Sequence, residues 1–199
     1  MSLTVDYYLV PQSPWTYLGH ARFVELARAS GAQVRVLPMD LGVIFPLSGG
    51  LPLPKRAPQR QAYRLVELQR FAAHLGLPLN LKPRFFPVAG DDASRLIIAA
   101  DLHLGAAAAL ALTGAVLSAV WVQERDIADA ATLAALLSEV GLDSALQAQS
   151  RSPAVQQRYE ANTQAAIDAQ VFGAPSYVVE GELFWGQDRL DYLARRLNA

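Results

Sequence analysis

The chain has 199 residues, of which 52% are hydrophobic and 18% are charged, so it can bury a packed core and does not belong to the disordered class. Its formal net charge of −1 provides no basic field, which argues against binding to nucleic acid and favours small-molecule chemistry. It contains no cysteine, which excludes disulfides, thiolate metal sites and dithiol redox chemistry by its own side chains.

A strand, a helix and a second strand are predicted within the first forty residues. The segment 3–10 (LTVDYYLV) is rich in β-branched and aromatic residues, which predicts a strand. Ser13 and Pro14 have the pattern of a helix N-cap followed by the first helical residue, and the helix is expected to end near Gly31. The run 34–37 (VRVL) predicts the second strand, so this end of the chain is interpreted as a βαβ unit with a parallel pair.

The middle of the chain is predicted to be helical after an irregular linker. Residues 42–58 contain several prolines and glycines and few helix signals, which predicts irregular structure. Apolar residues then recur at helical spacing over 59–74, and segments rich in alanine and leucine follow. These further helices are expected at 93–104, 106–123, 130–140, 144–149 and 153–169.

The stretch 104–122 carries no charge and is about long enough to span a bilayer. Most of its residues are Ala, Gly, Thr or Ser, and no basic flank fixes an orientation, so a buried helix is the preferred interpretation and a membrane span is the alternative. Residues 1–6 contain no basic segment and no long apolar one. No secretory signal is therefore predicted, and the cytoplasm is the expected location.

The strand pattern returns near the end of the chain. Residues 176–179 (SYVV) and 183–185 (LFW), joined by a tight turn, predict a hairpin, and a last helix is expected to start at Gly186. A βαβ unit at one end and a ββα unit at the other therefore flank a helical middle. We interpret this as an α/β domain formed by 1–45 and 170–199, interrupted by an all-helical insertion domain over 46–169.

Short motifs in a fixed order carry a resemblance to a known family. The strongest are 171–176 (VFGAPS), 184–190 (FWGQDRL) and 13–18 (SPWTYL), with weaker support from 48–52 (SGGLP), 63–71, 86–87 (FP) and 119–121 (AVW). With these motifs the chain resembles the 2-hydroxychromene-2-carboxylate isomerase family, which is related to DsbA-like oxidoreductases and kappa-class glutathione transferases. The resemblance implies a thioredoxin-like fold, glutathione as the cofactor, an aromatic small-molecule substrate and a homodimer, with no nucleic-acid or membrane partner.

Ser13 stands where redox relatives carry the first cysteine of a C-x-x-C motif, and Thr16 stands at the second. A serine hydroxyl can donate a hydrogen bond to the thiolate of bound glutathione, and the helix N-terminus would favour the same charge. A hydrogen bond to a charged acceptor is worth about 1.5–3 kcal/mol, which lowers a thiol pKa by about one or two units. The alternative is that Ser13 is only an N-cap. The two roles are compatible, because capping uses the oxygen and thiolate binding uses the proton.

The resemblance also implies glutathione-binding roles near the other end of the chain. Pro175 matches the position of a cis-proline, and Ala174 would then offer its backbone N–H and C=O to the cysteinyl part of glutathione. Gln187 and Asp188 open the last helix, where N–H groups can receive the γ-glutamyl carboxylate and the Asp188 carboxylate can pair with the ammonium group. The alternatives are an ordinary turn proline and a favourable acidic residue in a first helical turn.

Two further binding positions depart from the family pattern. Arg60 stands where kappa-class relatives have a lysine that contacts the glycine end of glutathione, and its donor geometry differs. As an alternative, Arg60 is simply a solvated surface residue. Gly50 occupies the place of a frequent asparagine, so a polar contact from that side chain is lost or replaced. Trp15, Phe86 and Pro87 are the expected walls of the second-substrate pocket.

These residues favour one function and leave two alternatives. The histidines, His20, His74 and His103, have no partners at ligand spacing, so no metal site is predicted. The preferred hypothesis is a glutathione-dependent isomerase of 2-hydroxychromene-2-carboxylate or a similar aromatic hydroxy or keto acid, in which Ser13 stabilises the glutathione thiolate that adds reversibly to the substrate. One alternative is a kappa-like glutathione transferase that conjugates electrophiles. The other, from a different class, is a non-catalytic thioredoxin-like binding module.

Overall fold

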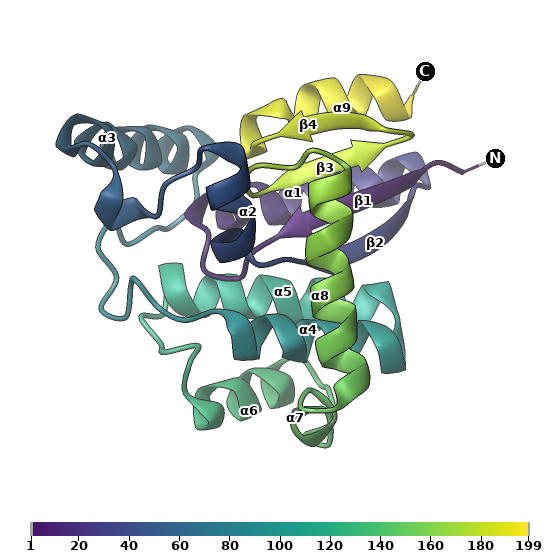
Figure 1. Cartoon of the computed structure of the whole chain (residues 1–199). Helices are drawn as coiled ribbons and strands as arrows, with labels where there is room; N and C mark the ends of the chain where they lie inside the picture. Colours follow the sequence, from purple (N-terminus) through teal and green to yellow (C-terminus); the bar gives the residue numbers. More distant parts are fainter. Residues whose placement is uncertain (1, 199) are drawn as a thin grey trace.

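A four-stranded mixed sheet lies at the centre of the structure, a computed structural model that describes residues 2–198 (Figure 1). The strand order is β2-β1-β3-β4. β1 (Thr4–Leu9) pairs in parallel with β2 (Gln33–Pro38), while β3 (Ser176–Val179) pairs antiparallel with both β1 and β4 (Glu182–Trp185). The predicted βαβ unit and the C-terminal hairpin are both present and share one sheet, which is the thioredoxin-like plan.

One face of the sheet packs against α1 (Pro14–Ser30) and α9 (Leu190–Leu197). Side chains of a strand alternate between the two faces, so Tyr7 and Tyr177, which are directly paired across β1 and β3, both lie on this side. Together with Phe23 of α1 they form a fully buried aromatic cluster with ring centroids 4.5, 4.7 and 5.4 Å apart. This cluster fixes α1, and therefore the start of α1, against the sheet.

The opposite face carries Tyr8 and Val178 and packs against α2 (Leu41–Ser48) and α8 (Pro153–Asp168). Figure 1 shows α8 crossing one face of the sheet while α1 lies behind the other. The sheet is therefore covered on both sides, and its two central strands, β1 and β3, are largely buried.

The expectation of irregular structure over 42–58 is wrong for the helix α2 and for the short 3-10 turn η1 (Leu53–Lys55). The Asp40 side chain caps α2 by accepting a hydrogen bond from the Gly42 N–H at 2.6 Å. Ile44 is buried under α2 against the sheet. A good cap and tertiary burial thus outweigh the local helix-breaking residues.

A layer of helices extends the core beyond the β2 edge of the sheet (Figure 1). One hydrophobic cluster contains residues of the sheet and of these helices, so the core is continuous across the predicted domain border. The border between 45 and 46 falls inside α2, and the division into two domains stays a prediction. The helices of this layer are α4 (Asp91–Leu104), α5 (Ala106–Trp121), α6 (Ala130–Glu139) and α7 (Leu146–Gln149). The helix α3 (Pro58–Leu75) lies apart from them and contacts α1 (Figure 1).

The uncharged stretch 104–122 is almost entirely the helix α5. Its buried side chains, among them Leu112 and Val116, belong to the main core, which explains the apolar sequence. From residue 2 to residue 198, no helix combines the length and the apolar character needed to cross a membrane.

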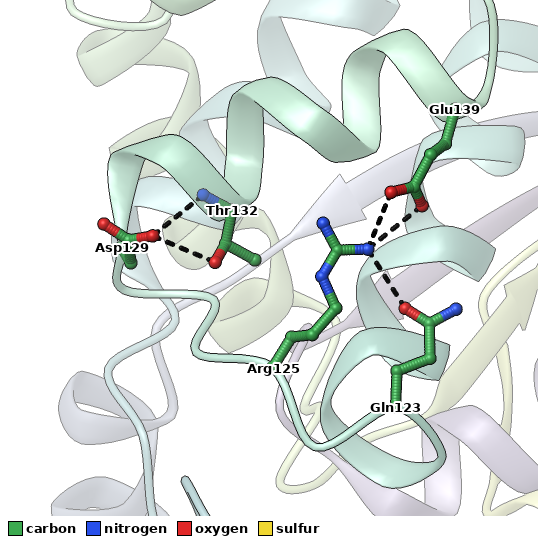
Figure 2. Close-up of polar contacts among 5 residues, drawn as sticks. All are labelled: Gln123, Arg125, Asp129, Thr132 and Glu139. Atoms are coloured by element: carbon green, nitrogen blue, oxygen red, sulfur yellow. Dashed lines mark hydrogen bonds and ion pairs between the residues drawn. The ribbon is translucent and has the colours of Figure 1, made fainter.

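The loop between α5 and α6 is held by exposed polar contacts (Figure 2). The Arg125 guanidinium donates to both carboxylate oxygens of Glu139, at 2.8 and 3.0 Å, and to Gln123 at 3.1 Å. Asp129 caps α6 by accepting hydrogen bonds from the N–H of Thr132 at 2.9 Å and from its hydroxyl at 3.0 Å. These hydrogen bonds lower the pKa of the Asp129 carboxyl.

Candidate functional site

The N-terminus of α1 is buried and is capped by Ser13. The Ser13 backbone is extended, with φ −80° and ψ 124°, and its Oγ accepts a hydrogen bond from the Thr16 N–H at 3.1 Å. Ser13 is only 8% exposed, because the sheet and the chain before β3 lie against it. The predicted N-cap is therefore present, and it occupies the Ser13 oxygen as an acceptor.

The hydroxyl of Ser13 also reaches the chain segment before β3. Ser13 Oγ donates to the Ala174 carbonyl at 3.5 Å, across a sequence separation of 161 residues. This is the long limit of a hydrogen bond, so the Ser13 proton is held weakly. The Ala174–Pro175 peptide bond is cis, as the resemblance implies.

Gly186 links Pro175 to the predicted glutathione-binding turn. Its N–H donates to the Pro175 carbonyl at 2.9 Å, and its φ of +103° lies in the region that favours glycine. A Cβ at Gly186 would lie 2.6 Å from Asp188 Oδ1, so the carboxylate sits directly over this glycine. The expected helix starts later than predicted, because Gln187–Arg189 forms a 3-10 turn (η2) ahead of α9.

Gln187 and Asp188 present different groups at this turn. The Gln187 side chain is 2% exposed and points to α1, where its Oε1 accepts from Arg22 at 3.1 Å. The Asp188 carboxylate is partly exposed and pairs with Arg189 at 2.6 Å. Among the described residues, no acceptor is found for the backbone N–H groups of Ala174, Gln187 and Asp188. A ligand at this corner would therefore meet backbone donors and the Asp188 carboxylate, and not the amide of Gln187.

Two buried side-chain oxygens beside Ser13 lack hydrogen-bond partners within residues 2–198. Thr16 Oγ1 belongs to a residue with no exposed surface, and Gln12 Oε1 lies where a Cβ on Gly90 would approach it to 2.2 Å. Buried polar atoms of native proteins normally have partners. Both atoms lie close to the α1 N-terminus, and Thr16 Oγ1 is closed off from the surface.

No contact in the described chain ties Gly50 and Arg60 to the Ser13 corner. A Cβ at Gly50 would lie 2.3 Å from the Phe45 ring, so Phe45 fills the space that the side chain of an asparagine would need. The departure from the family pattern at Gly50 thus has a local packing reason. Arg60 is exposed in the first turn of α3.

Two of the three predicted pocket-wall residues make aromatic contacts, and the third is exposed. Trp15 packs edge-on against Phe71 of α3, with ring centroids 6.1 Å apart. Phe86 packs against the buried Trp121 at 4.8 Å. Pro87 is exposed and follows a second cis peptide bond, Phe86–Pro87, which no sequence signal had indicated.

Arg64 was not predicted to be a site residue from the sequence, although it contacts the aromatic pair Phe86 and Trp121. It is half-buried on α3, with its guanidinium carbon 5.2 Å from the Phe86 ring centroid and 5.8 Å from that of Trp121. Burial, with a smaller effect from Arg56, lowers its pKa to about 10. The sequence feature that could have indicated Arg64 is its spacing from Phe71. The two residues are seven apart, about two helical turns, which places both on one face of α3.

His20 is a structural residue. It is 7% exposed, its Nδ1 lies 3.1 Å from the Tyr7 hydroxyl, and its Nε2 lies 3.0 Å from the Leu110 carbonyl. Burial lowers its pKa to about 4. A neutral imidazole with both nitrogens engaged joins α1 to α5 and has no free nitrogen for a ligand.

Comparisons with known proteins cover nearly the whole chain. A family model described as a DSBA-like thioredoxin domain matches residues 4–198. A 2-hydroxychromene-2-carboxylate isomerase of Pseudomonas putida is 35% identical over 94% of this chain and 91% of that protein, and one of Sphingobium xenophagum is 31% identical over 97% of each. The solved structure of a 2-hydroxychromene-2-carboxylate isomerase has a TM-score of 0.80 with 29% identity and covers 98% of this chain and 94% of that one. The similarity therefore includes both ends of the chain and the helical middle.

Proposed function

We propose, because this chain belongs to the 2-hydroxychromene-2-carboxylate isomerase family of DsbA-like thioredoxin domains, that it is a glutathione-dependent isomerase of 2-hydroxychromene-2-carboxylate or a similar aromatic hydroxy or keto acid. The observation that carries the cofactor part is the Ser13 hydroxyl, which lies at the buried N-terminus of α1 beside Ala174 in a chain without any thiol. The N-terminus of a helix stabilises a negative charge such as that of a thiolate. Because this chain has no cysteine, the thiolate has to come from a bound molecule.

The groups around Ser13 fit the polar parts of glutathione. The N–H and C=O of Ala174 can pair with the cysteinyl backbone in the manner of an added strand. The free N–H groups of Gln187 and Asp188 suit the γ-glutamyl carboxylate, and the Asp188 carboxylate suits the adjoining ammonium group.

When bound, glutathione supplies a thiolate nucleophile that adds to the substrate and is later eliminated from it, so the product has the same atomic composition as the substrate. Ser13 would stabilise this thiolate by donating its proton. The Thr16 N–H already donates to the Ser13 oxygen, which polarises the hydroxyl and makes it a stronger donor. The positive end of α1 adds to the same effect, so the thiol would be deprotonated at a lower pH than in water.

The test is turnover of 2-hydroxychromene-2-carboxylate, followed by ultraviolet absorbance, with glutathione, without it, and with S-methylglutathione. We expect turnover only with glutathione, because S-methylglutathione occupies the same contacts but cannot form a thiolate. Equal turnover without any thiol would contradict the cofactor assignment. A stable conjugate with 1-chloro-2,4-dinitrobenzene and no isomerisation would favour a transferase. Failure of calorimetry to detect glutathione binding at millimolar concentration would favour a binding module.

A further inference from the structure

Arg64 is a half-buried cation without a counterion. Its guanidinium lies over the faces of Phe86 and Trp121, and no carboxylate or hydrogen-bond acceptor of residues 2–198 is paired with it. The charged residue that acts on it is Arg56, another cation, whose Nε donates to the Leu51 carbonyl at 2.8 Å. Arg56 therefore does not offset the charge of Arg64.

Other arginines of the chain are paired with carboxylates. Arg70, on the same helix, is more exposed and pairs with Glu67 at 3.1 Å, and Arg125 pairs with Glu139 at 2.8 Å. The faces of Phe86 and Trp121 stabilise the Arg64 charge in part. They provide no hydrogen-bond acceptor for its N–H groups, which distinguishes Arg64 from the paired arginines. An anionic ligand would supply the missing partner.

The position of Arg64 places this anion site at the proposed substrate pocket. Arg64 and Phe71 share one face of α3, and Phe71 packs against Trp15, two residues after Ser13. Trp121, under the guanidinium, has a buried indole N–H for which no acceptor is found in the described chain. Phe86, on which the Arg64 guanidinium also lies, was expected to form the pocket wall, whereas Trp121 is fully buried and supports the guanidinium from below.

We infer that Arg64, supported on Phe86 and Trp121, binds the carboxylate of the second substrate and makes the pocket specific for planar aromatic carboxylates. The guanidinium fork matches the two oxygens of a carboxylate, and aromatic faces suit a planar ring attached to it. This inference rests on the proposed function for the identity of the pocket. It assigns the anion specificity to a residue outside the glutathione corner.

The experiment compares the binding of two probes, trans-2-hydroxycinnamate and its amide, by calorimetry in the presence of S-methylglutathione. Arg64→Met keeps the length of the side chain and removes the charge. We expect it to weaken carboxylate binding about ten- to a hundredfold and to change amide binding less than about twofold. Arg64→Lys should restore part of the carboxylate preference. Arg70→Met, on the same helix, is the matched control and should change neither affinity.

Several results would overturn the inference. They are an unchanged preference for the carboxylate in Arg64→Met, an equal loss of both probes, and the same loss in Arg70→Met. The readout requires no turnover and no thiol, so it is separate from the test of the proposed function. Arg64-dependent carboxylate binding in a protein that isomerises without glutathione would support the anion site and contradict the cofactor assignment. Glutathione-dependent turnover together with an unchanged preference for the carboxylate in Arg64→Met would support the cofactor assignment and contradict the anion site.

Discussion

Two helices, α1 and α6, begin with the same hydrogen bond in opposite surroundings. Ser13 accepts from the N–H of Thr16 at 3.1 Å, and Asp129 accepts from the N–H of Thr132 at 2.9 Å. At α6 the threonine hydroxyl also bonds to its cap, at 3.0 Å, and the cap is exposed (Figure 2). At α1 the threonine hydroxyl is fully buried and has no partner in the described chain. Capping thus accounts for the threonine hydroxyl at α6 and leaves the one at α1 without an explanation.

The choice of cap residue supports the same distinction. Aspartate and serine are comparable N-caps, so helix formation alone would accept either one at position 13. A carboxylate has no proton to donate and would repel a neighbouring thiolate, whereas a serine hydroxyl can cap with its oxygen and donate its proton. Ser13 is therefore the kind of cap that leaves a donor for a bound anion.

The largest effect is expected from Ser13→Ala, which removes both roles of this residue. Loss of a hydrogen bond to a thiolate, worth about 1.5–3 kcal/mol, lowers kcat/KM about ten- to a hundredfold. It also raises the pKa of the bound glutathione thiol by about one or two units. Thiolate absorbance measured against pH, with the steady-state kinetics, checks both expectations.

Ser152→Ala is the matched control, since α8 also opens with serine and proline and Ser152 accepts from the Val155 N–H at 3.4 Å. Each substitution removes one N-cap and should lower the free energy of unfolding by about 1 kcal/mol. Only Ser13→Ala should change the activity or the thiol pKa. Equal activity of the two variants would show that Ser13 is a cap and nothing more.

A smaller effect is expected from Asp188→Asn, which tests the far side of the corner. Asp188 is partly exposed and already paired with Arg189, so solvent screens its interaction with the ammonium group of glutathione. We expect the Kd for glutathione, measured by calorimetry, to rise about three- to tenfold. Asp191→Asn, in the first turn of α9, removes an equivalent charge near the same turn and should leave the Kd unchanged. Similar increases in both variants would indicate a general effect of charge.

Thr16→Val tests whether the buried hydroxyl without a partner serves a ligand. The substitution is nearly isosteric and removes an unsatisfied polar atom, so the free protein should become more stable by up to about 1 kcal/mol. The additional Tm gained on adding glutathione should be unchanged, because a fully buried hydroxyl does not reach the ligand. Thr132→Val should do the opposite in the free protein, because it breaks the hydroxyl contact to Asp129. A loss of stability in the free Thr16→Val protein would contradict this interpretation.

The sequence predicted the elements whose signals are local. The β-branched and aromatic residues of β1 and β3 and the Ser13–Pro14 cap are visible within a few residues, so the βαβ and ββα units could be located. α2 was missed because Pro46 and its neighbouring glycines suggest a loop, whereas burial of Ile44 against the sheet favours a helix. Tertiary packing overrides local propensity in that segment.

In the candidate site too, residues that lie in short sequence motifs could be predicted, and properties that depend on tertiary packing could not. Ser13 and Pro175 could be named because motif order connects them, and the structure places Ser13 Oγ against the carbonyl of Ala174. The unpaired state of Arg64 depends on which side chains the fold brings near it, and the packing of Phe45 on Gly50 depends on how α2 ends. Neither property has a signature in a short stretch of sequence.

The smallest effect is expected at α6, from Asp129→Asn. Asparagine is an equally good cap, so the substitution removes only the charge. Hydrogen bonds from the α6 N-terminus lower the pKa of Asp129 in the folded state from its ordinary 3.8, so its contribution to stability is present above that value and is lost as pH falls through the lowered one. The wild-type protein should therefore have a slightly higher Tm than the variant at pH 7 in low salt, and the difference should vanish in acid. A difference that grows in acid would contradict this sign. Activity and glutathione affinity should be unchanged, because Asp129 bonds to Thr132 of its own helix and no contact among the described residues joins this cap to the Ser13 corner.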